Sequence, residues 1–133
     1  MTDNGLITLQ SRNDFATTLA RFLEILADKR VSIFAQIDHA AGAAAAGLAL
    51  PPTTLVIFGN PTTGTPLMQA AQLAGIDLPL KALVWQAADG TVNLTYNAPS
   101  WVANRHGIGS KLEHAIEVLT TVVTALARYA TSA

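Results

Sequence analysis

Apolar and polar positions along this chain follow two periods, and the change from one period to the other predicts an alternation of strands and helices. Runs that are apolar throughout, or at every second position, predict strands at residues 6–10, 31–37, 53–58, 80–87 and 92–96. Apolar positions at helical spacing predict helices at about residues 14–30, 40–47, 66–74, 101–106 and 111–130. This order predicts an α+β fold in which a single antiparallel-rich sheet of about five strands packs against helices.

Turn and cap signals between these segments agree with that order. Asp89 and the glycine after it lie between two apolar runs and predict a tight hairpin. Asp38 is expected to cap the alanine-rich helix that follows it, and Ser100 to cap the helix at 101–106. Ser110 and Glu113 have the spacing of a capping box at the start of the last helix.

The junction from Phe58 to Met68 is the most constrained stretch of the chain. It leads from an apolar strand through Asn60-Pro61 and Gly64 to Thr65-Pro66. We expect Asn60-Pro61 to begin a tight turn, and Thr65 to cap a helix whose first residue is Pro66. Such a corner directs backbone N–H groups at one spot. It serves either as a well-specified turn or as a site for an anion or a polar ligand.

Composition narrows the classes of function. The chain has 133 residues and no cysteine, which excludes disulfides, thiolate nucleophiles and cysteine-ligated metals. Its net charge is −1 and no basic cluster occurs, so nucleic acid is not an expected partner. Only 13% of residues are charged whereas 50% are hydrophobic. This excess predicts apolar surface that a homodimer interface or a ligand cavity would cover.

We expect one cytoplasmic domain over residues 1–133. The chain begins without a basic region followed by an apolar segment, and the alanine-rich run 40–50 is too short to span a bilayer. No membrane partner is therefore expected. The length suits a single domain with its own hydrophobic core, and no repeat or linker divides it.

Several short motifs together are similar to one known family. They are Ile37-Asp38-His39, Gly47-Leu48 with Pro52-Thr53, Phe58-Gly59-Asn60-Pro61, Gly64-Thr65-Pro66-Leu67-Met68, Leu78-Pro79-Leu80, Tyr96-Asn97 and Arg105-His106. The chain resembles the family called domain of unknown function 302 over about residues 15–107, with an amphipathic helix following at about 111–130. The resemblance implies a compact α+β fold like that of the TATA-box-binding-protein-like group, and homodimers. It implies no established activity.

Polar residues at the predicted ends of elements are the candidates for a site. We expect a cleft that binds a small, partly apolar ligand or a protein partner. The candidate binding residues are Asn60, Thr63, Gly64, Thr65, Tyr96, Asn97, Trp101, Arg105 and His106. Under this hypothesis the domain is a homodimer without catalytic activity.

Two alternatives remain open at this point. The chain is a small enzyme in which His39 or His106 acts as a general base and Arg105 holds an anionic substrate, or it is a dimeric scaffold without a pocket. In either case the same polar residues also suit caps and turns. The three histidines show no metal-ligand spacing, and neither a nucleophile elbow nor a phosphate-binding loop occurs, so no metal or cofactor is expected.

Overall fold

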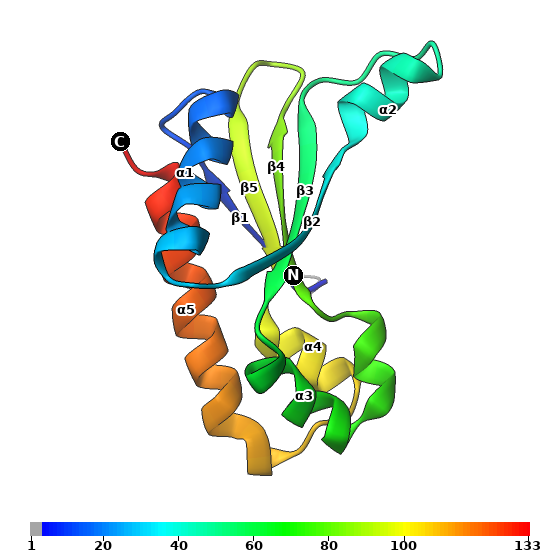
Figure 1. The fold of residues 1–133 in the computed structure, drawn as a ribbon, viewed down its shortest axis with the longest axis vertical. Coiled ribbons are helices and arrows are strands. Elements are labelled where there is room, and N and C mark those ends of the chain that lie inside the picture. Colours follow the sequence, from blue (N-terminus) through cyan, green and yellow to red (C-terminus); the bar gives the residue numbers. More distant parts are fainter. Residues whose placement is uncertain (1–3) are drawn as a thin grey trace.

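The computed structural model of the chain describes residues 4–133 and contains a five-stranded antiparallel sheet in the order β1-β5-β4-β3-β2 (Figure 1). The first three residues of the predicted domain lie outside the described residues. The strands are β1 Leu6–Gln10, β2 Ser32–Asp38, β3 Thr53–Gly59, β4 Leu80–Gln86 and β5 Val92–Asn97. The helices are α1 Phe15–Asp28, α2 His39–Ala45, α3 Pro61–Ala70, α4 Pro99–Arg105 and α5 Glu113–Thr131, with short 3₁₀ segments η1 Gln72–Ile76 and η2 Ser110–Leu112. The predicted α+β class is confirmed.

Helices α1 and α5 cover one face of the sheet, and the core lies between them and the strands (Figure 1). Val56 and Phe58 alternate along β3 with less buried neighbours, so one side of this strand faces the helices. The Phe22 ring of α1 meets the Phe58 ring edge to face, with the centroids 5.4 Å apart. The fully buried side chains on this face include Phe22, Leu26, Val56, Val84 and Leu94.

The hairpin and the cap at Asp38 form as predicted. The Ala87 N–H donates to the Thr91 carbonyl at 2.7 Å and closes the turn between β4 and β5. The Asp38 carboxylate accepts from the Ala41 N–H at 2.9 Å and caps α2.

Helix α3 begins five residues earlier than the sequence predicted, at Pro61 rather than Pro66. Asn60 is its N-cap, because the Asn60 side-chain oxygen accepts from the Thr62 N–H at 2.9 Å. Thr65, the predicted cap, and Pro66 therefore lie inside the helix. The prediction was wrong because both Asn60-Pro61 and Thr65-Pro66 have the cap-then-proline pattern, and the chain uses the first as soon as β3 ends.

Two other predicted caps are also wrong. Helix α4 begins at Pro99, one residue before Ser100, and no side chain caps it. The predicted capping box of Ser110 and Glu113 does not form, because the 3₁₀ turn η2 precedes α5 and leaves Leu112 at its N-cap position. In both cases the chain enters the helix through a backbone turn instead of a side-chain cap.

Residues 32–52 are here called the β2–α2 arm, in which β2 is paired with β3 in the sheet whereas helix α2 and the loop after it extend away from the rest of the molecule (Figure 1). Strand β2 is an edge strand, and six of its seven residues are exposed. Helix α2 has no buried residue. Its alanine side chains therefore contribute little to the core of this chain.

Within residues 4–133, no helix has the length and apolarity that crossing a bilayer requires.

Candidate functional site

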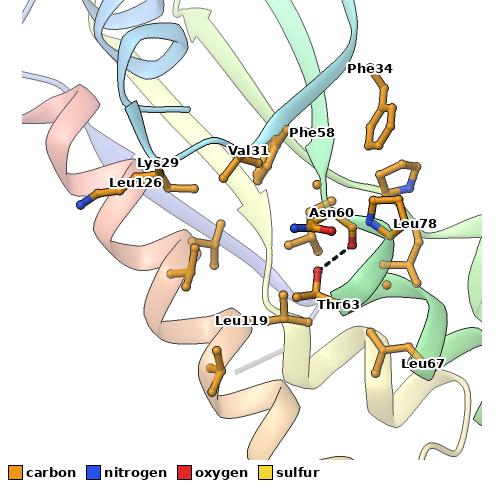
Figure 2. A pocket seen from close by; sticks show the side chains of 18 of the residues that line it. Lys29, Val31, Phe34, Phe58, Asn60, Thr63, Leu67, Leu78, Leu119 and Leu126 are labelled. Carbon is orange, nitrogen blue, oxygen red and sulfur yellow. Dashed lines mark hydrogen bonds between the residues drawn. The ribbon is translucent and has the colours of Figure 1, made fainter. Parts of the chain in front are cut away.

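A groove of about 790 Å³ lies between α5, the end of α1 and the corner that joins β3 to α3 (Figure 2). The chain segment before β4 completes its wall. Its walls are mostly apolar and include Ile25, Val31, Phe34, Phe58, Leu67, Met68, Leu78, Pro79, Leu80, Val118, Leu119, Val122, Val123 and Leu126. Volume and lining both fall in the range of small-molecule sites.

Helix α5 supplies one long side of the groove. Val118 and Val122 are 44% and 43% exposed although both are apolar, because they face the groove instead of the sheet. The lining positions on this helix run from Val118 to Tyr129. At a rise of 1.5 Å per residue this side is roughly 17 Å long. The groove is therefore elongated along α5.

The corner at the start of α3 forms the opposite wall. Most of its polar groups already have partners within the chain. The Asn60 side-chain oxygen accepts from both the N–H and the hydroxyl of Thr62. The Asn60 carbonyl accepts from the Thr63 hydroxyl at 2.8 Å and from the N–H groups of Thr63 and Gly64 at 2.9 and 3.1 Å. Since these first-turn N–H groups are occupied, the geometry favours a structural turn over an anion site.

Lys29, just after α1, is the charged residue of the groove lining within the described part of the chain. Figure 2 shows its ammonium directed away from the labelled apolar side chains.

Tyr129 is the last residue of α5 that lines the groove. Its hydroxyl donates to Glu24, which raises the pKa of Tyr129, and the Arg21 guanidinium lies over its ring, 4.1 Å from the centroid.

A second polar cluster surrounds Asp77, just after η1. His106 Nε2 lies 2.5 Å from one carboxylate oxygen, and Arg105 Nη1 lies 3.0 Å from both. The side chains of His106 and Asp77 are only 9% and 14% exposed. Burial raises the pKa of Asp77, but the His106 hydrogen bond and the Arg105 charge outweigh it, so the pKa is lowered overall. Lys81 Nζ donates to the carbonyls of Asp77 and Pro79.

The structure divides the predicted site residues into separate places. Asn60, Thr63, Gly64 and Thr65 line the groove. Arg105 and His106 belong to the Asp77 cluster, with Trp101 beside them at 5.8 Å from ring centroid to guanidinium carbon. The expected single cleft that joins these two segments does not form, because the groove lining in residues 4–133 contains none of the residues from 96 to 106.

The remaining predicted residues lie elsewhere. Tyr96 is buried in the core, and its hydroxyl lies 3.4 Å from that of Thr124. Asn97 is the last residue of β5 and pairs with Leu6. His39 is the first residue of α2, exposed on the β2–α2 arm. Strand alternation places Tyr96 and Asn97 on opposite faces of the sheet, so the two cannot share one cleft.

Four residues that matter for these sites were not recognised from the sequence. Val118, Val122 and Lys29 line the groove, and none of the three was predicted to face a cavity. A wide apolar stripe on α5 was the available clue, since Val118 and Val122 broaden it beyond the buried positions. Asp77 also escaped notice, because its two partners are 28 and 29 residues away.

Comparison with known proteins decides the family. The model of the family "Domain of unknown function DUF302" matches residues 7–127. The chain belongs to this family. A crystal structure of an uncharacterized conserved DUF302 protein from Bacillus stearothermophilus has the same fold, with a TM-score of 0.83 at 18% identity. That likeness covers 96% of this chain and 98% of the other.

Curated relatives of this DUF302 chain carry a different kind of name. Proteins called fluoride-specific ion channel FluC 1 from Brucella suis and Brucella abortus are each 44% identical to it over 128 residues. The match covers 96% of this chain but 50% and 47% of the two relatives. The chain thus spans about half the length of the curated relatives it matches.

Proposed function

We propose that this DUF302 domain binds a small, largely apolar molecule in the groove beside α5, and that it does so without catalysis. The observation that carries the proposal is a groove of about 790 Å³ with mostly apolar walls, in which most polar groups of the Asn60 corner are bonded to one another. An apolar ligand would remove Val118 and Val122 from water, which favours binding.

The positions of the histidines weigh against the enzyme alternative. A general base has to reach the substrate within hydrogen-bonding distance, directly or through one water. His39 lies on the β2–α2 arm, and His106 and Arg105 are paired with Asp77 outside the groove lining. The candidate acid–base groups and the cavity are therefore in different places.

We also propose that the domain forms a homodimer through the sheet face opposite α1 and α5, starting at β2. That face carries Ile37, Leu55 and Leu83 in one row across neighbouring strands, and Ile37 is 41% exposed. Asp38 is the only Asp, Glu, Lys or Arg between residues 31 and 76. Pairing with Ile57 places Lys81 at one end of this face, where its ammonium donates to two carbonyls of the same chain. A surface with so little charge suits a second copy, because a twofold contact brings like residues together and uncharged ones do not repel.

Native mass spectrometry of protein isolated gently from its own cells tests both statements. We expect a dimer that carries an additional bound mass per chain. Ile37→Lys should shift the population to monomer, because it places a charge in the apolar contact, and should keep the bound mass. Gln36→Lys is the matched control, since it adds the same charge on the same strand toward the other face.

The outcomes separate the alternatives. A monomer that retains a ligand contradicts the dimer alone. A dimer without any added mass over a range of protein concentrations contradicts the ligand and supports the scaffold alternative.

A third proposal concerns the setting in which the domain acts. Relatives that share it are named fluoride-specific ion channels and are about twice its length. Since no helix in residues 4–133 is suited to cross a membrane, we infer that the channel of these relatives resides in their other half. We propose that the DUF302 domain modulates such a channel.

A further inference from the structure

We propose that the ligand of the groove is a single-chain amphiphile, with an extended hydrocarbon tail along α5 and an anionic head group beside Lys29. This inference rests on the proposed ligand-binding function and adds the chemical class of the ligand. It follows from the shape of the groove, from the state of its polar groups and from the position of its charge.

Shape favours a chain over a compact ring system. The side formed by α5 runs for roughly 17 Å at 1.5 Å per residue, and positions 118, 122, 125, 126 and 129 recur along it at helical spacing. Apolar residues continue along this side, with Val118 exposed at its first position and Val122 one turn further along the helix. A tail lying along the helix would cover both valines at once.

The state of the polar groups favours a hydrocarbon body. At the corner, the N–H groups of residues 62–64 and the hydroxyls of Thr62 and Thr63 all have partners within the chain. A sugar, nucleotide or peptide would lose hydrogen bonds to water here and would regain few from the protein. A hydrocarbon tail has no such bonds to lose.

The position of the charge favours an anionic head. Neither ion pair formed among the described residues involves Lys29. Figure 2 shows its ammonium pointing away from the apolar walls. A carboxylate head would sit there in water with the tail below it, as amphipathic groups do at an apolar edge. Glu24, the acidic group nearest to Tyr129, already accepts the Tyr129 hydroxyl.

The two parts of the ligand contribute differently. Each additional methylene should tighten binding by about two- to fourfold. Values below the upper end are expected because the groove is partly open and removes only part of each methylene from water. An exposed ion pair contributes much less, about two- to fivefold in total. Tail length should therefore set the affinity, and the head should set the preference for negative over positive charge.

Titration calorimetry with the chain of residues 1–133 tests this, using saturated carboxylates of increasing chain length below their micelle concentrations. Primary alcohols and alkyltrimethylammonium ions of equal length serve as matched probes. We expect affinity to rise about two- to fourfold per methylene, and carboxylates to bind more tightly than ammonium ions. Lys29→Gln should weaken the carboxylates about two- to fivefold and leave the alcohols unchanged.

A blocking variant keeps the test independent of the head group. Val122→Trp fills the groove from an exposed position and should weaken every alkyl probe by at least about tenfold, the size of an anchor contact. His114→Trp is the control, since His114 is exposed on the same helix and lies outside the groove lining. N-phenyl-1-naphthylamine, a neutral apolar dye, reports whether the groove binds anything apolar.

The outcomes distinguish this inference from the function on which it rests. One outcome is that the dye binds and Val122→Trp blocks it, but the affinity for carboxylates depends neither on tail length nor on Lys29. In that case the groove binds apolar molecules, and the proposal of a single-chain amphiphile is wrong. If neither the dye nor any alkyl probe binds, the proposed function itself fails. A change of oligomeric state in Val122→Trp would instead assign the groove to a protein partner and overturn the inference.

Discussion

Asp77 joins the end of η1 to the end of α4, which lies 28 residues later in the sequence. Its carboxylate binds His106 and Arg105 at the end of α4, and its carbonyl accepts from Lys81 at the start of β4. It directly precedes Leu78 and Pro79, which line the groove. The sequence suggested His106 as a general base and Arg105 as the group that holds an anionic substrate. In the structure both side chains bind Asp77 and so connect the end of η1 to the end of α4.

Asp77→Asn should destabilise the protein in a pH-dependent way. Because the folded pKa of Asp77 lies below its ordinary value of 3.8, the unfolded chain binds more protons near that pH. The stabilisation is thus complete above about pH 4 and is lost as the pH falls through the lower folded pKa. Urea unfolding should show a loss of about 1–2 kcal/mol at pH 7.

The pH series supplies the check on this explanation. The difference between the native chain and Asp77→Asn should shrink as the pH is lowered from 4 toward 2. An equal difference at all these pH values would mean that the carboxylate charge has no part in the stability.

At the scale of elements, most segments follow from local pattern and most helix starts do not. The strands and the hairpin form where alternation and the Asp-Gly pair place them. The observed start of α3 differs from the predicted one because two pairs have the cap-then-proline pattern, Asn60-Pro61 and Thr65-Pro66, and they are five residues apart. Strand β3 decides between them, since Gly59 still pairs with Ser32 and the chain turns at the next residue.

A matched pair of substitutions tests which residue caps α3. Asn60→Ala should cost about 1 kcal/mol, because it removes the acceptor for the Thr62 N–H. Thr65→Ala should change the free energy of unfolding by no more than about 0.5 kcal/mol, since Thr65 lies inside the helix and alanine favours helix. Chemical denaturation measures both, and Asn60→Asp, which keeps an acceptor, should restore most of the loss.

The reverse ranking would place the cap at Thr65. In that case the corner would be built as the sequence alone suggested.

At the scale of the whole molecule, much of the apolar composition lies in three places. One part forms the core between the sheet and helices α1 and α5. A second part lines the groove, and a third lies exposed on the β2–α2 arm, at Ile37, Leu48 and Leu50. The groove is the surface through which we propose contact with a ligand, and Ile37 belongs to the sheet face through which we propose contact with another copy.

The proposed link to fluoride channels can be measured on a relative. The complete Brucella suis protein and a shortened form without the half that matches this chain should be reconstituted in vesicles, with fluoride efflux followed by electrode. We expect fluoride flux per protein to differ at least about twofold between the two, the size of a weak coupling between sites. Addition of the present chain to the shortened form should move its flux toward that of the complete protein. Equal flux in both forms would remove the proposed modulation.

The candidate site was predictable only where its residues are close together in sequence. Asn60, Thr63, Gly64 and Thr65 line the groove, and all lie within one corner of the chain. Whether this corner and the segment 96–106 share a cleft depends on the direction that α4 takes after β5, which local pattern does not specify.

The sequence by itself determined the family, the order of strands and helices, and the positions of the hairpin and of the Asp38 cap. These follow from periodicity and from hydrogen bonds between residues only a few positions apart. Only the tertiary structure decided that α5 leaves Val118 and Val122 beside the corner at Asn60, and that Asp77 joins His106 and Arg105. A groove and a long-range ion pair depend on how elements pack in space, and residues 28 to about 60 positions apart carry no mutual pattern in the sequence.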